Sequence, residues 1–395
     1  MKTVLGLDRI GEFASMFKGK RIGLITNSSG VDSRWRTNVE VFTDAGFAIT
    51  RIFTPEHGMY GKRAARPVED DVYPGYAIPM VSLFGKKQRP EAGQLQDLDL
   101  LVYDIQDVGL RYYTYIYTMT YCMEAAAQQG IPFVVLDRPN PLGNRIVSGG
   151  RIRPELRSFI GDYELPVRYG LTCGELGRYF LWYKGISMDY RVIAMEHYTR
   201  DMYYSDTGQL WNIPSPALTD FESTICYCGG CFAGATSLSD GRGSPEPFRM
   251  YGAPYVDMRR LYQEMKREAA QEDVVFRERA FIPTEGVYQG QVCFGLEFAP
   301  LRKDLDFLPT ALTLLRQTAR MYPEAFTLRD GEAGEKHLSY QTGSWKTEQY
   351  LKGAVTRKEL LEEWETQSAA FAKEAEPVRI YTSREEEHHE IIYDR

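Results

Sequence analysis

The chain has 395 residues, of which 43% are hydrophobic and 13% aromatic, which is enough for a large buried core and about two domains. Its 47 Lys and Arg residues against 54 Asp and Glu residues give a net charge of −7 without a long basic block, which argues against a nucleic acid partner. No window approaches the roughly 20 apolar residues of a membrane span, and residues 1–30 lack a secretory signal's apolar region. We therefore expect a cytoplasmic protein, although the sequence is also compatible with the trimmed form of a secreted one.

Short apolar runs alternate with amphipathic stretches through the first half of the chain. Strands that alternate with helices are typical of an α/β fold with a parallel sheet. The first apolar run is followed by ITNSSGVD, whose single Gly30 lacks the spacing of a phosphate-binding loop. We therefore expect a Rossmann-like domain without a dinucleotide or other cofactor. The predicted strands are 20–26, 47–56, 98–107 and 131–141, and the predicted helices are 38–46 and 114–130.

The pattern changes after about residue 250. Helices are predicted at 254–269 and 308–323, and a strand at 287–299. Residues 356–381 read as a charged amphipathic helix that runs into a short strand. The sequence thus predicts a Rossmann-like catalytic domain at 1–250 and a smaller α+β domain at 251–395 that completes the cleft.

Polar side chains follow four of the predicted strands. In an open parallel sheet, ligands bind at the carboxyl ends of the strands, where such side chains come together. The sequence therefore predicts a site at this edge of the sheet. The polar residues are Asn27 and Ser28, Glu56 and His57, Asp104 and Asp107, and Asp137 and Arg138.

The segment FTPEHGMYG predicts a rigid turn, because Pro55 and Gly58 flank its two functional side chains. Glu56 and His57 would then project from a fixed backbone just past a strand. A carboxyl group beside apolar and aromatic neighbours can have the raised pKa of a general acid. The alternative is that Glu56 caps the following helix or pairs with an arginine.

The segment DIQDVGLRYYTYIYTM places two acids and an arginine directly after an apolar strand. Asp104 and Asp107 are candidate catalytic carboxylates, and the alternative for either is an ion pair with Arg111. The tyrosines suit a pocket wall that stacks on a sugar ring, although tyrosines at the start of a helix also suit a core. They are Tyr112, Tyr113, Tyr115 and Tyr117.

Two further segments contain groups that could carry chemistry. In LDRPNP, two prolines fix the loop that presents Asn140, and Arg138 suits an anionic substituent such as a carboxylate. In CYCGGC, Cys226, Cys228 and Cys231 lie close together, but structural zinc needs a fourth ligand and no histidine is near in sequence. We interpret CYCGGC as a glycine-rich turn with incidental thiols and expect no metal.

Two carboxylates in one cleft, together with arginines, amides and tyrosines, fit glycoside hydrolysis by acid and base catalysis. Phosphoryl transfer would need a phosphate-binding loop, and GLTCGELG around Cys173 lacks the G-x-S-x-G sequence of a serine hydrolase. A metal-assisted hydrolase that uses CYCGGC or the acid cluster is a further hypothesis.

Seven segments occur in the order in which a known family has them. They are TNSSGVD, FTPEHGMYG, VSLFGKKQRP, LDLLVYDIQDVGLRYYTYIYTM, VVLDRPNPLG, LPVRYGLTCGELGRYF and SDGRGSPEPFRMYGAPYVD. In these segments the chain resembles the NamZ-type exo-β-N-acetylmuramidases. The resemblance covers most of the chain and is strongest between residues 20 and 255.

The resemblance implies a two-domain enzyme with a Rossmann-like first domain. Such enzymes remove a terminal N-acetylmuramic acid (MurNAc) from the non-reducing end of peptidoglycan fragments whose MurNAc is free of its peptide. Arginines in the cleft would meet the lactyl carboxylate of that sugar. The resemblance implies a site with Glu56, His57, Asp104, Asp107, Arg111, Tyr113, Arg138, Asn140 and Arg242, to which the strand-end pattern adds Asn27 as a substrate-binding residue.

On this hypothesis Glu56 is the general acid, and Asp104 or Asp107 activates water or supports the transition state. His57, Arg138 and Arg242 orient the substrate. The chain departs from the family pattern, which has a glutamate where this sequence has Gly234 and asparagines at two other positions, here Ala217 and Ser237, and an acid where it has Ser148. These departures favour an alternative function, a sugar- or muropeptide-binding protein with altered specificity or lost turnover.

Overall fold

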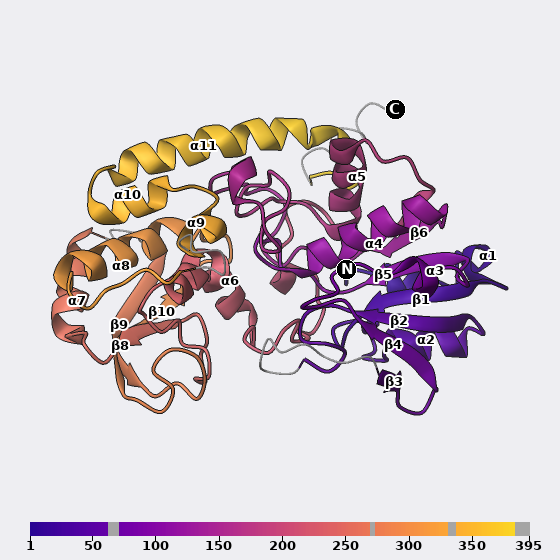
Figure 1. Ribbon diagram of the computed structural model, residues 1–395, viewed down its shortest axis with the longest axis horizontal. Helices are drawn as coiled ribbons and strands as arrows, with labels where there is room; N and C mark the ends of the chain where they lie inside the picture. The colour runs from indigo at the N-terminus through magenta and orange to yellow at the C-terminus, as the bar shows by residue number, and fades with distance from the viewer. Residues whose placement is uncertain (62–70, 269–272, 331–336, 384–395) are drawn as a thin grey trace.

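The computed structural model describes residues 1–61, 71–268, 273–330 and 337–383. The chain forms two halves that lie side by side, with one long helix passing over both (Figure 1). A seven-stranded sheet is the centre of the first half, and a three-stranded sheet is the centre of the second. The predicted α/β class and the two-part organisation are confirmed.

The seven-stranded sheet is parallel except for its edge strand β3, which pairs antiparallel with β4. Without β3, the strand order matches the 3-2-1-4-5-6 order of the Rossmann fold. The chain direction across the sheet reverses between β1 and β5, and this switch point is where Rossmann proteins bind their ligands. In spatial order the strands are β3 (Asp71–Tyr73), β4 (Ile78–Ser82), β2 (Ala48–Thr54), β1 (Arg21–Thr26), β5 (Leu100–Asp104), β6 (Phe133–Leu136) and β7 (Tyr190–Ile193).

Both faces of this sheet are covered, which explains why its central strands are apolar runs rather than alternating ones. Successive residues point to opposite faces: Leu24 packs with Phe42 of α2, whereas Ile25 belongs to the core that contains Ile116 of α4. The helices of the first half are α1 (Ala14–Phe17), α2 (Asn38–Asp44), α3 (Ala92–Leu95), α4 (Tyr115–Gln129) and α5 (Cys173–Lys184).

The second half is built on an antiparallel sheet in which β10 pairs with both β8 and β9. The predicted helices at 254–269 and 308–323 are confirmed as α7 and α8. The sequence analysis missed β9, whose burial alternates irregularly between its ends. The elements are α6 (Phe221–Gly230), β8 (Met250–Ala253), α7 (Met258–Glu268), β9 (Val274–Phe281), β10 (Cys293–Pro300), α8 (Leu308–Met321), α9 (His337–Thr342), α10 (Lys346–Lys352) and α11 (Arg357–Glu374).

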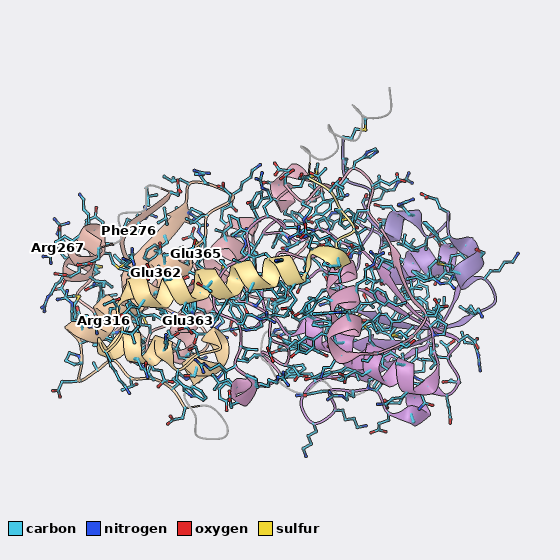
Figure 2. All side chains as sticks on the ribbon, turned by 90° about the horizontal axis from the view of Figure 1, so that it is seen from above. Arg267, Phe276, Arg316, Glu362, Glu363 and Glu365 are labelled. Carbon is cyan, nitrogen blue, oxygen red and sulfur yellow. The ribbon has the colours of Figure 1, made fainter. Side chains whose placement is uncertain are left out.

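Helix α11 joins the two halves. It starts over the second half and ends beside α5 of the first (Figure 1). At its far end Glu374 forms a 2.7 Å ion pair with Arg151. The hydroxyl of Ser368 donates a 2.8 Å hydrogen bond to the carbonyl of Gly149. The view from above shows the helix running along the length of the molecule, with Glu362, Glu363 and Glu365 labelled on its first part (Figure 2).

The chain after α11 returns to the first half, but not as a strand. The predicted short strand is wrong, because residues 376–378 form a 3-10 helix and residues 379–383 belong to no strand. The amide of Ile380 donates to Glu175 over 2.9 Å, and the hydroxyl of Tyr381 donates to Asp137 over 2.7 Å. Buried carboxylates near β6 therefore take these hydrogen bonds in place of a neighbouring strand.

Candidate active site

A pocket of about 390 Å³ lies where the two halves meet. Residues from distant parts of the sequence line it, so the pocket exists only when both halves are folded together. From the first half it is lined by Glu56, His57, Tyr112, Tyr113, Thr114, Tyr115 and Ile160. The segment 215–218 also lines it, and the second half adds Tyr227, Arg242, Phe248, Glu285, His337 and Gln341.

Glu56 and His57 reach the pocket from the predicted rigid turn, which is confirmed. The amide of Gly58 donates to the carbonyl of Pro55 over 3.0 Å, and His57 has a φ of 68°, which is unusual for a residue other than glycine. The Glu56 side chain is only 18% exposed, and its Oε1 lies 3.9 Å from Nε2 of His57. Its Oε2 accepts a 2.7 Å hydrogen bond from the hydroxyl of Thr114. Glu56 is thus held by a side chain, rather than capping a helix.

One wall of the pocket, the tyrosine wall, consists of three tyrosines that follow β5. They are Tyr112, Tyr113 and Tyr115. Tyr112 and Tyr113 are buried but reach its lining. The hydroxyl of Tyr112 donates to the carbonyl of Tyr227 over 2.9 Å and accepts from the amide of Gly229 over 3.0 Å. Tyr117 instead lies in the core and donates to the carbonyl of Arg111 over 2.6 Å. The segment therefore supplies both a pocket wall and a core, as the two alternatives proposed.

Arg242 faces the pocket from the second half. Its Nε and Nη2 pair with Asp240 at 3.0 Å, and the charge of Asp240 raises the pKa of Arg242. Nη1 makes no hydrogen bond within the described part of the chain. A Cβ atom at Gly234 would lie 2.8 Å from both Arg242 Nη2 and Asp240 Oδ2, which is closer than such atoms approach. The absence of a side chain at Gly234 therefore leaves room for this ion pair.

Asp104 and Arg138 do not line the pocket, contrary to the sequence prediction. Both are buried, and Arg138 Nε lies 2.6 Å from Asp104 Oδ1. The other oxygen of Asp104 accepts from Asn38 over 2.8 Å, and Arg138 also donates to the carbonyl of Val31 over 2.9 Å. A carboxylate and an arginine that satisfy each other in this way hold the strand ends together.

An ion pair of Arg111 with Asp104 or Asp107 was the alternative to their catalytic role, and Arg111 forms neither pair among the described residues. Its guanidinium is completely buried and donates to the carbonyls of Gly150, Leu165 and Gln341, at 2.6, 2.7 and 2.7 Å. Burial without a carboxylate partner lowers its pKa to about 10. Because Gln341 belongs to α9 and also lines the pocket, Arg111 connects the two halves beside the site.

Asp107 is also outside the pocket lining. It is buried and accepts hydrogen bonds from the hydroxyl of Tyr169 and, over 2.7 Å, from the amide of Gly109. Burial raises its pKa to about 6, and these two hydrogen bonds oppose the shift. Asp107 thus fixes the turn that leads into the tyrosine wall. Its predicted catalytic role has no support from its position.

The two asparagines support loops behind the site. Asn27 donates to the carbonyl of Pro214 over 3.4 Å, next to the lining segment 215–218, and accepts from the amide of Ser29 over 2.9 Å. Asn140 donates to the carbonyl of Leu171 over 3.1 Å and accepts from the amide of Leu142. Of the predicted site residues, the pocket therefore brings together Glu56, His57, Tyr113 and Arg242.

Sequence reasoning missed five polar residues of the lining, which are Thr114, Ser215, Glu285, His337 and Gln341. Thr114 lies inside a motif that was recognised, and its position next to the first helical residue could have indicated a role. Glu285, His337 and Gln341 lie on second-half segments that carry no motif. Burial lowers the pKa of His337, as do the positive charges of Arg329 and Arg242. The second half therefore contributes more of the site than the sequence indicated.

CYCGGC, predicted as a glycine-rich turn, lies at the end of α6. The helix kinks at Cys228 and Gly229, and all the cysteines of the described residues are buried and free. Within residues 1–61, 71–268, 273–330 and 337–383, no group of three or more His, Cys, Asp or Glu side chains has metal-binding geometry. In the same ranges, no helix is long and apolar enough to span a bilayer.

Comparison with models of protein families shows which family the chain belongs to. The N-terminal family model of the exo-β-N-acetylmuramidase NamZ matches residues 22–222, and the C-terminal model matches residues 225–381. The chain belongs to the NamZ family. This membership confirms the resemblance seen in the motifs and makes the chain an exo-acting glycosidase. The two NamZ models meet near the start of α6, whereas the boundary at residue 250 stays a prediction.

Known proteins similar to the chain agree with this assignment. The peptidoglycan β-N-acetylmuramidase NamZ of Bacillus subtilis (strain 168) is 38% identical over 329 residues, which are 82% of this chain and 79% of that protein. A crystal structure of a DUF1343 family protein from Bacteroides fragilis has a TM-score of 0.87 and 27% identity, and the match covers 96% of this chain and 99% of that one. A second DUF1343 structure from the same organism, at 23% identity and a TM-score of 0.75, shows the same fold over 97% of this chain and 100% of that one.

The pKa of Asp107 leads to a prediction about stability. Its native pKa of about 6 exceeds its ordinary value of 3.8, so between these values the native state binds more protons than the unfolded state. The free energy of unfolding should therefore fall by up to about 1.4 kcal/mol for each pH unit as the pH rises from about 4 to about 6. In urea unfolding across this range, the free energy of unfolding of Asp107→Asn should fall less with rising pH than that of the unchanged protein.

A matched control is Asp97→Asn. The hydrogen bond from Arg51 lowers the pKa of Asp97, so this group contributes little titration above pH 4 and its removal should leave the slope unchanged. Equal slopes for Asp107→Asn and the unchanged protein would contradict the assignment.

Proposed function

We propose that the chain releases a terminal MurNAc from the non-reducing end of peptidoglycan fragments, with Glu56 as the general acid. The observation that carries the proposal is the position of Glu56, which reaches the pocket between the halves from a rigid turn in a member of the NamZ family. The Bacillus subtilis relative bears the name of this activity. A peptidoglycan-derived saccharide is therefore the proposed partner of the site.

The size of the pocket supports an exo-acting enzyme. Small-molecule sites measure about 300–1,000 Å³, and this pocket, at about 390 Å³, is near the lower end of that range. A site of this size suits one terminal sugar and not several units of a glycan strand. Tyrosine rings in the wall can stack on the sugar while the hydroxyls of Tyr112 and Tyr115 remain bonded to backbone carbonyls.

Arg242 is the proposed contact for the lactyl carboxylate of MurNAc. Arg138 cannot take this role in the described arrangement, because Asp104 pairs with it in a buried position. Arg242 keeps its Nη1 donors available on the side chain that lines the pocket, and guanidinium donors match the geometry of a carboxylate. This assignment separates a muramide from a glucosaminide, which lacks the lactyl group.

Thr114 is proposed to position the acid. Its hydroxyl donates to Oε2 of Glu56, which fixes the side-chain rotamer and leaves Oε1 to carry the proton to the leaving oxygen. Donation to a glycosidic oxygen needs one oxygen of the carboxyl group to face the substrate. The pair of a turn-bound glutamate and a helix-bound threonine supplies this orientation.

A second candidate function is sugar binding without turnover. The ion pair between Asp240 and Arg242 occupies the space next to Gly234, where a side chain would otherwise stand. This arrangement would keep recognition of an anionic sugar while catalysis is lost. Binding of MurNAc in calorimetry, without any product after long incubation, would favour this function.

The test of the proposed function compares two leaving groups. The protein should release 4-nitrophenol from 4-nitrophenyl β-N-acetylmuramide and not from the glucosaminide, and it should cleave the disaccharide MurNAc-β-1,4-GlcNAc. Glu56→Gln should reduce cleavage of the disaccharide by about 10²–10⁴-fold. The loss should be smaller for the nitrophenyl substrate, because nitrophenolate leaves without much help from an acid. Equal turnover of the disaccharide by Glu56→Gln and the unchanged protein would contradict the acid assignment.

Substitution of Thr114 tests the positioning role. A hydrogen bond contributes about 1 kcal/mol, and up to about 3 kcal/mol when one partner is charged, so Thr114→Val should lower kcat on the disaccharide by roughly tenfold or more. KM should change little. Thr114→Ser keeps the hydroxyl and should keep most of the activity, which separates this role from simple packing. A loss of the same size in both variants would contradict it.

A further inference from the structure

The carboxylates expected to assist Glu56 are absent from the pocket lining. Asp104 is neutralised by Arg138, and Asp107 is held by Tyr169 and Gly109 behind the tyrosine wall. Glycoside hydrolysis by a pair of acids nevertheless needs a second carboxylate facing the anomeric carbon. Among the described residues that line the pocket, Glu285 is the acidic residue other than Glu56.

The backbone holds Glu285 next to Arg242. Gly243 has a φ of 78°, and its carbonyl accepts two hydrogen bonds from Thr284, one from the amide at 3.1 Å and one from the hydroxyl at 2.8 Å. A Cβ atom at Gly243 would lie 2.6 Å from the amide nitrogen of Glu285. Only glycine therefore permits this approach of the two loops. As a result, Arg242 and Glu285 reach the pocket from one hydrogen-bonded platform.

The charges around Glu285 leave its carboxylate available. Arg242 is already paired with Asp240 at 3.0 Å, and burial lowers the pKa of His337 on the neighbouring helix α9. In the described part of the chain, the Glu285 side chain makes no ion pair or hydrogen bond. It is half-buried rather than exposed on the surface. A partly shielded carboxylate of this kind can accept a proton from water or a hydrogen bond from a sugar hydroxyl.

We propose that Glu285 is the second catalytic carboxylate and acts as the general base. The inference rests on the proposed function of the same pocket. Glu56 and Glu285 come from opposite halves of the chain, so a sugar bound between them would have the acid on one side and the base on the other. The proposal assigns the site to the class of glycosidases in which water attacks the face opposite to the leaving group.

The proposed step conserves atoms and charge. Glu285 takes a proton from water while the water oxygen forms a bond to the anomeric carbon. The bond from that carbon to the glycosidic oxygen breaks, and Glu56 gives its proton to the departing oxygen. Glu285 ends protonated and Glu56 ionised, and exchange with solvent restores both. Direct attack by water inverts the anomeric carbon, so a β-muramide should first give the α-anomer of MurNAc.

The experiment measures kcat and KM for Glu285→Gln on the nitrophenyl muramide and on the disaccharide. A missing general base slows attack on any leaving group, so kcat should fall by about 10²-fold or more on both substrates, with KM within a few-fold. This pattern differs from that of Glu56→Gln, whose defect depends on the leaving group. Glu278→Gln is the matched control, because Glu278 lies on β9 and pairs with Arg259 outside the pocket, and it should keep full activity.

Two further readouts separate catalysis from folding and binding. Thermal unfolding should show that Glu285→Gln is folded. Azide should restore release of nitrophenol by Glu285→Ala, because the shorter side chain leaves room for an anion that attacks the anomeric carbon without a base. Proton NMR of the unchanged enzyme should show the α-anomer of MurNAc before mutarotation.

Each other outcome has a distinct meaning. Full activity of Glu285→Gln, a change in KM alone, or a β-anomer as the first product would overturn the role of Glu285 and leave the proposed function in place. No release from any substrate by the unchanged protein would overturn the proposed function, and the base assignment with it.

Discussion

The buried ion pair between Asp104 and Arg138 is the interaction on which the arrangement of the strand ends depends. It lies at the carboxyl end of β5, beside the switch point of the sheet, which is the binding crevice of Rossmann proteins. Asn38 and the carbonyl of Val31 complete its hydrogen bonds. Removing one partner of such a buried pair costs about 3–5 kcal/mol. These groups are therefore part of the protein core, and neither Asp104 nor Arg138 lines the pocket between the halves.

The pocket lies between the halves, and several buried groups hold those halves together. Arg111 donates from the first half to the carbonyl of Gln341 in the second, and α11 spans both. The segment that follows α11 returns to the first half, where the hydroxyl of Tyr381 donates a hydrogen bond to Asp137. A pocket built on such connections keeps its two walls in a fixed relation, which acid and base catalysis requires.

Local sequence patterns predicted the elements that local forces determine. The apolar runs gave β1, β2, β5 and β6, and the glycine and proline positions gave the turn that presents Glu56 and His57. The final strand was predicted wrongly because an extended apolar segment looks the same whether it pairs with a strand or, like Ile380 and Tyr381, with buried carboxylates.

The site was predictable only in part, for a physical reason. Polar residues at strand ends show that charges gather there, but the sequence does not show which acid each arginine neutralises. Arg138 pairs with Asp104, whereas Arg111 binds only carbonyls. Glu285 and His337 reach the pocket through long-range packing, which no motif records. The second half therefore supplied residues that reasoning from strand ends could not find.

The central claim is that the ligand binds in the pocket between the halves and not in the crevice of the sheet. A crystal structure of Glu56→Gln soaked with MurNAc-β-1,4-GlcNAc tests this most directly. The account predicts the MurNAc ring against the tyrosine wall, with its lactyl carboxylate at Arg242 and its anomeric carbon between residue 56 and Glu285. A sugar bound at the carboxyl ends of β1 and β5, with the pair of Asp104 and Arg138 opened, would contradict it.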